Sequence, residues 1–293
     1  MGVVRGMDVR RVAVIGTGTM GCGIAQVAAA AGWEVRLFDA KPGLAEAARE
    51  RAGSMLDKAA QGGKMTPDAA RAARQLLGSA GTLEEAAARA DLVVEAVPED
   101  IGLKESIFRT LGKICREDAL LASNTSSLSL TRLADAASHP QRVLGLHFFN
   151  PPYRMKLLEI VRGAQTSDAA VEAAIQVARR MGKEAIVVRD SPGFATSRLG
   201  VALGLEAMRM LQEGVAKAED IDKAMELGYG HPMGPLRVSD LVGLDVRLSI
   251  ARTLHAELGA PHFEPPQILV DKVREGKLGK KSGEGFYRWD SGG

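Results

Sequence analysis

The chain has 293 residues, which exceeds the size of one average domain, so two domains or one domain with a large extension are expected. Its composition is 46% hydrophobic and 25% charged, as in an ordinary globular protein. A formal net charge of +2, from 38 basic and 36 acidic residues, creates no broad field for a polyanion, and no block of Lys or Arg alternates with aromatic residues. We therefore expect no nucleic-acid partner.

The cysteine and hydropathy patterns exclude further classes of protein. Cys22 and Cys115 form neither a metal-ligand spacing nor a disulfide framework, so we interpret both as packing thiols and predict no metal site. The start of the sequence, MGVVRGMDVRRVAVIG, lacks the long apolar core and cleavage site of a signal peptide. Nowhere do about 18 uncharged apolar residues follow one another. We expect a cytoplasmic protein without a membrane partner.

Short apolar runs alternate with alanine-rich helical segments from residue 11 to about residue 190. The runs are RVAVIG, EVRLFD, DLVVEAV, ALLASN, VLGLHFF, LLEIV and EAIVV. Such alternation is typical of βαβ units. It predicts an α/β domain over residues 1–190, with a doubly wound, mainly parallel sheet of the Rossmann type.

The first run is followed by Gly16-x-Gly18-x-x-Gly21, at the start of a helical pattern. Asp39 ends the next run, 18 residues beyond Gly21, where the dinucleotide-binding pattern places an acidic residue at about 20. Glycines let backbone N–H groups approach a pyrophosphate at a helix N-terminus, and a carboxylate accepts hydrogen bonds from ribose hydroxyls. The motif predicts NAD as cofactor, because Asp39 would repel the 2′-phosphate of NADP. The alternative is a tight turn that binds no ligand.

The segment between the second and third runs has more than forty residues, too many for one crossover helix. The sequence QGGKMTP divides it, with alanine-rich helical patterns on both sides. We predict that this segment, at about residues 40–90, contains a helical hairpin, here called the arm, that projects from the sheet.

The fourth run ends in Asn124-Thr125-Ser126-Ser127, and a further helical pattern follows. These residues could be helix N-caps and nothing more. A hydroxyl at the carboxyl end of a parallel strand also points toward the crevice in which doubly wound sheets bind ligands. Asn150 has the same ambiguity, because Asn-Pro opens turns in any case.

One histidine and one glutamate interrupt the apolar runs of VLGLHFFNPPYRMKLLEIV, residues 143–161. If these runs form an antiparallel hairpin centred on Tyr153, then His147 and Glu159 lie opposite each other, with Cβ atoms roughly 5 Å apart. A carboxylate beside an imidazole fixes its tautomer and makes it a better general base near neutral pH. The alternatives are a structural ion pair, or parallel strands in which the two residues never meet.

Pro192 and Gly193 mark a boundary at about residue 190. Beyond it the pattern predicts helices over residues 195–213, 217–228, 235–258 and 265–276, and no strand. Apolar residues, Leu199 among them, recur all round the first of these helices, which is more than a surface helix needs. We therefore predict an all-helical second domain over residues 191–293, with some faces buried against a partner subunit.

Several motifs together resemble, in order, those of the L-3-hydroxyacyl-CoA dehydrogenase family, particularly its short 3-hydroxybutyryl-CoA dehydrogenases. They are GxGTMGxGIA, DLVVEAVPE, SNTSSL, HFFNPP with MKLLEIVRG, SPGF, HPMGP and GKKSGEGFY. The resemblance covers nearly the whole chain. It implies NAD-dependent oxidation of a (3S)-3-hydroxyacyl-CoA to the 3-ketoacyl-CoA, or the reverse, in a homodimer. The helical domain would then serve substrate binding and dimerisation.

The resemblance also implies roles for individual residues. His147 would be the general base, Glu159 would orient it, and Ser126 would bind the substrate oxygen near the nicotinamide. The implied cofactor contacts are Gly16, Gly18, Thr19, Met20, Gly21, Asp39, Glu99, Lys104, Asn124, Ser126, Asn150 and Lys281. The implied substrate contacts are Ser126, Asn150 and Ser197, together with Ser54, Lys58 and Lys64 of the arm for the phosphates of CoA.

Two residues depart from the family pattern. Ser197 stands where PGF-x-x-N-R usually has Asn, and a hydroxyl is shorter and offers fewer hydrogen-bonding groups than an amide. Arg154, in the hairpin loop, is bulkier than the small or apolar residue expected there. Both bear on acyl-chain preference, which the sequence does not determine. A dehydrogenase of free hydroxy or sugar acids, and an inactive dinucleotide-binding protein, are the alternative functions.

Overall fold

The computed structural model describes residues 8–289. The chain divides into two compact units, unit 1 up to Asp190 and unit 2 from Ser191 onward. The absence of a signal peptide is predicted from residues 1–16, and residues 1–7 of this segment lie outside the described part of the chain. No helix in the described part is long and apolar enough to cross a membrane.

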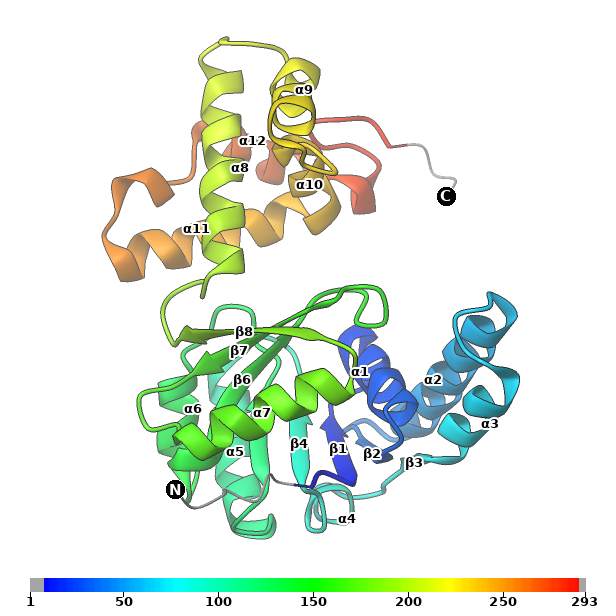
Figure 1. Cartoon of the computed structure of the whole chain (residues 1–293). Coiled ribbons are helices and arrows are strands. Elements are labelled where there is room, and N and C mark those ends of the chain that lie inside the picture. The colour runs from blue at the N-terminus through cyan, green and yellow to red at the C-terminus, as the bar shows by residue number, and fades with distance from the viewer. Residues whose placement is uncertain (1–7, 290–293) are drawn as a thin grey trace. The chain divides into compact units, whose positions relative to one another are not determined.

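Unit 1 contains an eight-stranded sheet with the order β3-β2-β1-β4-β5-β6-β7-β8 (Figure 1). The strands are β1 (Arg11–Ile15), β2 (Glu34–Phe38), β3 (Leu77–Ser79), β4 (Leu92–Glu95), β5 (Leu120–Ser123), β6 (Val143–Phe148), β7 (Leu157–Arg162) and β8 (Glu184–Arg189). The first six run parallel, β7 is antiparallel to β6, and β8 is parallel to β7. The predicted doubly wound Rossmann-type sheet is confirmed, and its strand order reverses between β1 and β4, where such sheets bind dinucleotides.

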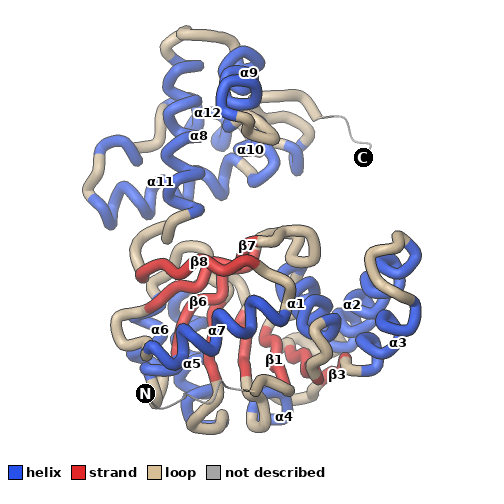
Figure 2. Tube along the Cα trace, viewed as in Figure 1, coloured by secondary structure: helices blue, strands red, loops and turns tan. Residues whose placement is uncertain are grey.

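Helices cover both faces of this sheet, with α1 and α7 on one face and α5 and α6 on the other (Figures 1 and 2). The helices of unit 1 outside the arm are α1 (Thr19–Ala30), α4 (Leu83–Ala87), α5 (Ile101–Ile114), α6 (Leu130–Ala136), the 3-10 helix η1 (Pro140–Arg142) and α7 (Asp168–Arg180). Side-chain caps start several of them: Asp100 accepts a hydrogen bond from the Leu103 N–H at α5, and Ser167 accepts one from Ala170 at α7.

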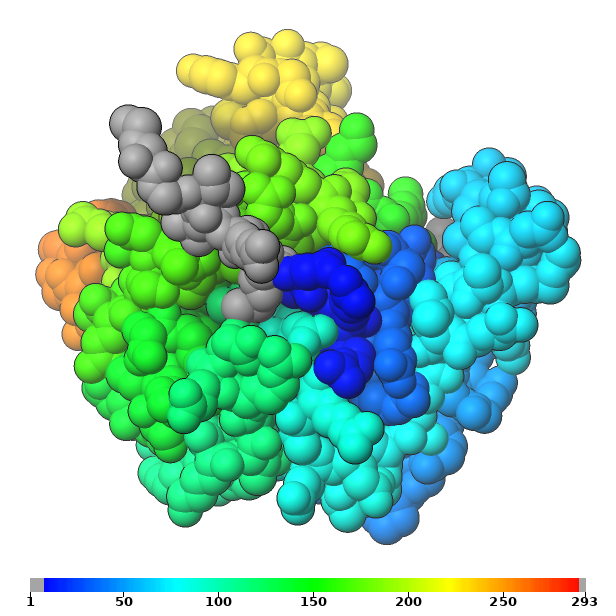
Figure 3. Space-filling view, turned by 60° about the horizontal axis from the view of Figure 1, so that its bottom comes forward, coloured from blue at the N-terminus to red at the C-terminus, as the bar shows by residue number. Residues whose placement is uncertain are grey.

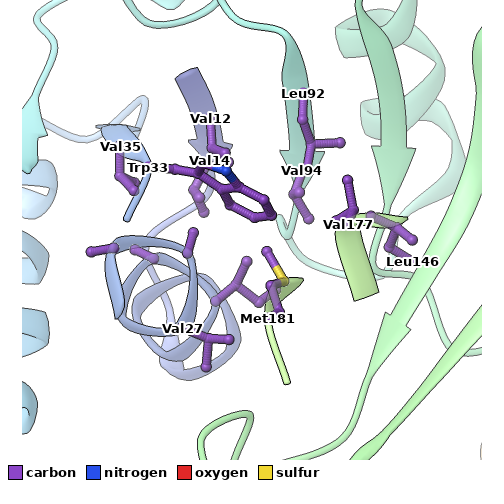
Figure 4. Close-up of a cluster of buried hydrophobic side chains, with 14 of the residues drawn as sticks. Val12, Val14, Val27, Trp33, Val35, Leu92, Val94, Leu146, Val177 and Met181 are labelled. Atoms are coloured by element: carbon purple, nitrogen blue, oxygen red, sulfur yellow. The ribbon is translucent and has the colours of Figure 1, made fainter. Parts of the chain in front are cut away.

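The core under α1 and α7 holds α1 in place (Figure 4). Val12 and Val14 of β1 point to the same face, as the alternation of a strand requires, and belong to the same buried cluster as Val27 of α1 and Val177 of α7. Trp33, which is only 1% exposed, fills the space at the end of α1. This packing fixes the N-terminus of α1 at the carboxyl end of β1.

The arm is a pair of helices, α2 (Leu44–Gln61) and α3 (Pro67–Gln75), joined at the predicted GGK turn. Thr66 caps α3, and Pro67 occupies its first turn. The space-filling view shows the arm, in light blue and cyan, standing out from the rest of unit 1 (Figure 3). The sequence pattern does not predict β3, because Leu77–Ser79 has no β-rich pattern and becomes a strand only by pairing with the edge strand β2.

Unit 2 is all-helical, as predicted. Its helices are α8 (Thr196–Gln212), α9 (Ala218–Tyr229), α10 (Pro235–Val242), α11 (Leu244–Leu258), the 3-10 helix η2 (Pro261–Phe263), α12 (Gln267–Arg274) and the 3-10 helix η3 (Lys280–Ser282). The prediction of one helix over 235–258 is wrong, because Gly243, with φ +104° and ψ 126°, separates α10 from α11. Asp240 of α10 then accepts hydrogen bonds from the N–H groups of Phe286 and Tyr287, which tie down the segment after α12.

Both cysteines are buried and unpaired. Burial raises the pKa of the Cys22 thiol, and it raises that of Cys115 to about 11, so both remain protonated packing groups at neutral pH. Within residues 8–289, no cluster of three or more His, Cys, Asp or Glu side chains is arranged to hold a metal ion.

Candidate active site

The glycine loop between β1 and α1 leaves room for a ligand at the helix N-terminus. Gly16 has a φ of +92°, and a Cβ there would lie 2.7 Å from the backbone of Ala96. A Cβ on Gly21 would lie 1.9 Å from the carbonyl oxygen of Gly16. At Gly18, in contrast, no described atom beyond its two chain neighbours lies within 4 Å of an added Cβ, and no side chain of the N-cap residue caps α1. Open space beside uncapped N–H groups fits a pyrophosphate.

Asp39 follows β2 and lies beside this loop. Its Oδ2 accepts hydrogen bonds from the Thr17 N–H (3.0 Å) and hydroxyl (2.7 Å), and its Oδ1 accepts one from the Lys41 N–H (3.0 Å). Burial by itself would raise the pKa of Asp39, but these hydrogen bonds outweigh it and hold the pKa below its usual value. A pocket of about 480 Å³, lined by residues 38–43, 45–46 and 80–83, adjoins the carboxylate and suits an adenosine. Sequence reasoning misses Thr17, because that position of the motif accepts any residue.

His147 and Glu159 form the predicted cross-strand pair. β6 and β7 are antiparallel, with His147 opposite Glu159, in the register centred on Tyr153. Nδ1 of His147 lies 2.9 Å from Oε2 of Glu159, and the two side chains are 8% and 0% exposed. The ring centroid of Phe149 lies 4.5 Å from that of the imidazole. The predicted hairpin is therefore confirmed, and the parallel alternative is wrong.

This contact determines what the imidazole can do. A carboxylate at Nδ1 keeps a proton on that nitrogen, because Nδ1–H then donates to a charged acceptor. The other ring nitrogen, Nε2, carries the lone pair in this tautomer. His147 lies near the carboxyl end of β6, and the glycine loop follows the carboxyl end of the parallel strand β1, so both belong to the same edge of the sheet.

Ser126 belongs to a group of hydroxyls around Glu99. Oε1 of Glu99 accepts hydrogen bonds from the Thr125 hydroxyl (2.5 Å) and the Ser126 N–H (2.9 Å), and the Ser126 hydroxyl lies 3.4 Å away. A different residue caps α6: the hydroxyl of Ser129 accepts a hydrogen bond from the Arg132 N–H at the start of this helix. The capping alternative therefore does not account for Ser126.

Lys104 is buried behind Glu99. Its side chain is 1% exposed, and its Nζ lies 2.7 Å from Oε1 of Glu95 and 3.4 Å from Oε2 of Glu99. The completely buried Glu95 also accepts a hydrogen bond from the Ser123 hydroxyl at 2.6 Å. The ammonium thus holds the two glutamates, and the implied contact between Lys104 and a cofactor stays a prediction. Sequence reasoning misses Glu95, although it interrupts DLVVEAV just as His147 interrupts its own run.

The two asparagines differ in position. Oδ1 of Asn124 accepts a hydrogen bond from the Phe148 N–H at 2.9 Å, which ties the end of β5 to β6 beside His147. Asn150 is exposed, and its peptide bond to Pro151 is cis. Asn124 therefore supports the strand that carries the histidine, whereas the exposed amide of Asn150 can reach a ligand directly.

The three candidate CoA contacts are exposed on the arm. Ser54 and Lys58 are four residues apart on α2 and so share one helix face, and Lys64 follows the helix. Arg51, from the same helix, donates a hydrogen bond to the Thr17 carbonyl at 3.0 Å. The arm is thereby tied to the glycine loop, and it presents cations to solvent, as phosphate binding requires.

The remaining candidates, Ser197 and Lys281, belong to unit 2. Ser197 is half-buried in the first turn of α8. Nζ of Lys281 lies 2.5 Å from Oδ1 and 2.7 Å from Oδ2 of Asp245. Burial would raise the pKa of Asp245, but the hydrogen bond from Lys281 helps to hold it below its usual value. Within unit 2, Lys281 thus pairs with a carboxylate, and its contact with a cofactor stays a prediction.

Comparison with known proteins agrees with this geometry. Residues 11–191 match the family model for the 3-hydroxyacyl-CoA dehydrogenase NAD binding domain, and residues 193–289 match that for the C-terminal domain of the same enzymes. The chain belongs to the 3-hydroxyacyl-CoA dehydrogenase family. The predicted resemblance, the oxidoreductase class and NAD as the cofactor are confirmed by this membership.

Relatives match nearly end to end. A probable 3-hydroxybutyryl-CoA dehydrogenase of Bacillus subtilis is 44% identical over 97% of this chain and 99% of its own length. The mitochondrial hydroxyacyl-coenzyme A dehydrogenase of Sus scrofa is 40% identical over 96% of this chain and 91% of its own. Among solved structures, (S)-3-hydroxybutyryl-CoA dehydrogenase from Ralstonia eutropha superposes with a TM-score of 0.93 at 36% identity, covering 97% of this chain and all of that one. The family assignment therefore applies to both units.

Proposed function

We propose that this protein catalyses the reversible, NAD-dependent oxidation of (3S)-3-hydroxyacyl-CoA to 3-ketoacyl-CoA. The observation that carries the proposal is the buried contact between His147 and Glu159, 2.9 Å long, at the same sheet edge as the glycine loop. A short acyl chain is the favoured substrate, because the Bacillus subtilis and Ralstonia eutropha relatives are named for 3-hydroxybutyryl-CoA.

The residues of the pair have distinct tasks in this reaction. Bound NAD would supply the acceptor for the hydride that leaves C3. His147 takes the proton of the 3-hydroxyl on Nε2 in the oxidation and returns it in the reduction. Glu159 keeps Nδ1–H oriented and stabilises the imidazolium that forms, as the aspartate does in a serine-protease triad. The hydroxyl of Ser126 donates to the 3-oxygen, so that developing charge on this atom is stabilised.

The other contacts of the proposal follow from the family resemblance. The glycine loop would hold the pyrophosphate of NAD, Asp39 would hold its adenosine ribose, and Glu99 and Asn150 would also contact the cofactor. The contacts with the pyrophosphate would be Gly16 and Gly18 of the loop and Thr19, Met20 and Gly21 of the first turn of α1. Ser54, Lys58 and Lys64 hold the phosphates of CoA, and unit 2 contributes Ser197 to the substrate and Lys281 to the cofactor. Lys104 and Asn124 act through the residues that they hold in place.

The proposal also includes a homodimer joined through unit 2, which serves substrate binding as well. Leu199, Leu227 and Tyr229 of this unit are 71%, 79% and 79% exposed in the single chain. Side chains of this size gain about 1.5–3 kcal/mol each on full burial, so a partner subunit would stabilise them. A cytoplasmic location remains a prediction.

Replacing His147 by Gln tests the base. The amide lacks a basic nitrogen, so we expect kcat to fall by about three orders of magnitude or more while the dissociation constant of NADH stays unchanged. Steady-state rates with acetoacetyl-CoA and NADH, together with NADH fluorescence titration, measure both. His139→Gln, on another part of unit 1, serves as control and should keep full activity. Near-normal turnover of His147→Gln would exclude this histidine as the base.

Competition by free CoA separates this function from the alternative of a free hydroxy or sugar acid. The basic arm predicts inhibition by CoA, which a small-acid enzyme would not show. Initial rates with acetoacetyl-CoA and with longer 3-ketoacyl-CoA thioesters then define the acyl-chain preference. Tight NADH binding without turnover of any such thioester would instead support the inactive dinucleotide-binding alternative.

A further inference from the structure

The loop between β6 and β7 is held from one side by the dinucleotide-binding helix. It forms a tight turn, in which the N–H groups of Arg154 and Met155 donate to the Pro151 carbonyl at 3.0 and 3.2 Å. Pro152 is the buried residue of this turn, and it packs on Gly23 of α1. A Cβ on Gly23 would lie only 2.7 Å from Cδ of Pro152, so the helix and the loop approach as closely as a glycine permits.

On the other side, a buried lysine holds the same loop. Lys183, in the turn before β8, is 8% exposed, and its Nζ donates hydrogen bonds to the carbonyl oxygens of Met155 (2.7 Å) and Pro152. No carboxylate in the described part of the chain forms an ion pair with it. Desolvation by burial lowers the pKa of Lys183. A buried ammonium with only carbonyl partners is costly for folding, which calls for a compensating benefit.

The position of the loop suggests that benefit. It begins two residues after His147 and ends three residues before Glu159, so any displacement of the loop moves the strand ends that hold this pair. Because Pro152 rests on α1, the loop also sets the spacing between the pair and the helix whose uncapped N-terminus would hold the cofactor pyrophosphate.

We propose that Lys183 is a positioning residue that clamps the β6–β7 loop against α1 and so sets the distance from His147 to the bound cofactor and substrate. The inference rests on the proposed function. Lys183 touches neither reactant, and its effect passes through the two carbonyl oxygens that it binds. Since hydride and proton transfer depend on alignment, a loosened loop lowers turnover more than it lowers cofactor binding.

The test compares Lys183→Met, Lys183→Arg and the control Lys156→Met, which changes an exposed lysine at the end of the same loop. We expect Lys183→Met to lower kcat at least about tenfold, and to leave the NADH dissociation constant within about twofold of the wild-type value. Hydrogen exchange of the segment 149–156 should accelerate, while that of β1 and α1 stays unchanged. Lys183→Arg keeps the charge and the donors, so its kcat should be at least about threefold higher than that of Lys183→Met. Lys156→Met should match the wild type in every measurement.

Wild-type kcat in Lys183→Met together with faster loop exchange would overturn the proposal, as would a uniform loss of protection and of NADH affinity. If Lys183→Met does not fold, Lys183→Arg decides: lowered kcat with faster loop exchange supports the clamp, and wild-type kcat despite faster exchange rejects it. The exchange measurement needs no substrate. If the wild type turned over no 3-hydroxyacyl-CoA, the proposed function would fail, whereas the clamp would still be judged by the exchange of the loop.

Discussion

Asp39 is fixed by its own chain before any ligand binds. It accepts two hydrogen bonds from Thr17 and one from Lys41, and since a carboxylate has roughly four acceptor positions, about one is left for a ribose hydroxyl. Its folded pKa lies below the ordinary value of 3.8. The stabilisation from these bonds is therefore present above that pH and is lost as the pH falls through the folded pKa. At neutral pH the group is charged and repels a 2′-phosphate.

Replacing Asp39 by Asn should weaken NADH binding about tenfold, because a hydrogen bond to a charged acceptor contributes about 1.5–3 kcal/mol. NADPH binding should weaken less or improve, since the repulsion of its 2′-phosphate is removed. Fluorescence titration with both cofactors measures the change. Asp118→Asn, which removes a carboxylate paired with Arg116, is the control and should change neither constant. An equal loss of affinity for both cofactors would count against the assignment of Asp39.

Residue by residue, the sequence predicted some of the site and missed the rest for physical reasons. The pairing of His147 with Glu159 could be predicted from the sequence. Once the midpoint of a hairpin is chosen, the position opposite each residue is fixed, and the two-residue period of strands determines which side chains share a face. The roles of Lys104 and Lys183 could not be predicted, because nothing in the sequence shows that a lysine is buried. Only the packed structure shows which oxygens surround each ammonium.

At the scale of elements, the buried pair of Glu95 and Lys104 joins the end of β4 to α5. Each charge lies in the interior and is compensated by the other, at 2.7 Å. Lys104→Met should therefore lower the free energy of unfolding by about 3–5 kcal/mol, because it leaves a buried carboxylate without its counter-charge. The double variant with Glu95→Gln should recover most of this loss. Urea unfolding measures both.

An exposed pair from the same helix provides the control for that experiment. Glu105 of α5 pairs with Arg132 of α6 at 2.7 Å, and the arginine side chain is 59% exposed. Arg132→Met should lower the free energy of unfolding by less than about 1 kcal/mol, since solvent screens such pairs. If Lys104→Met lowered the free energy of unfolding by a similarly small amount, the ion pair between Lys104 and Glu95 would contribute little to stability beyond packing.

Two elements show where local patterns stop being sufficient. The apolar period continues from 235 to 258, yet Gly243 adopts a φ of +104° and divides the helix, and the tail after α12 packs where the division occurs. Leu77–Ser79 is too short and too poor in β-branched residues to be recognised, and it extends the sheet because β2 offers an unpaired edge. Each outcome depends on a neighbour that is distant in sequence.

At the scale of the whole molecule, the exposed apolar side chains of unit 2 predict self-association. The wild type should sediment as a dimer at micromolar concentration, and Leu199→Arg, at a position 71% exposed in the single chain, should shift it toward the monomer. Sedimentation velocity measures this. Arg252→Glu, a charge change elsewhere on unit 2, is the control. A monomeric wild type would remove dimerisation from the proposed function.

The sequence by itself determined the Rossmann-type sheet, the helical second unit, the glycine loop with Asp39 and the hairpin that pairs His147 with Glu159. Each of these follows from local periodicity or from short-range spacing, which a linear sequence records. The tertiary structure alone decided which polar groups are buried together: Thr17 on Asp39, Lys104 between two glutamates, and Lys183 on the loop carbonyls. Burial depends on contacts between distant segments, and the loop of VLGLHFFNPPYRMKLLEIV is held by two of them, α1 and the turn before β8.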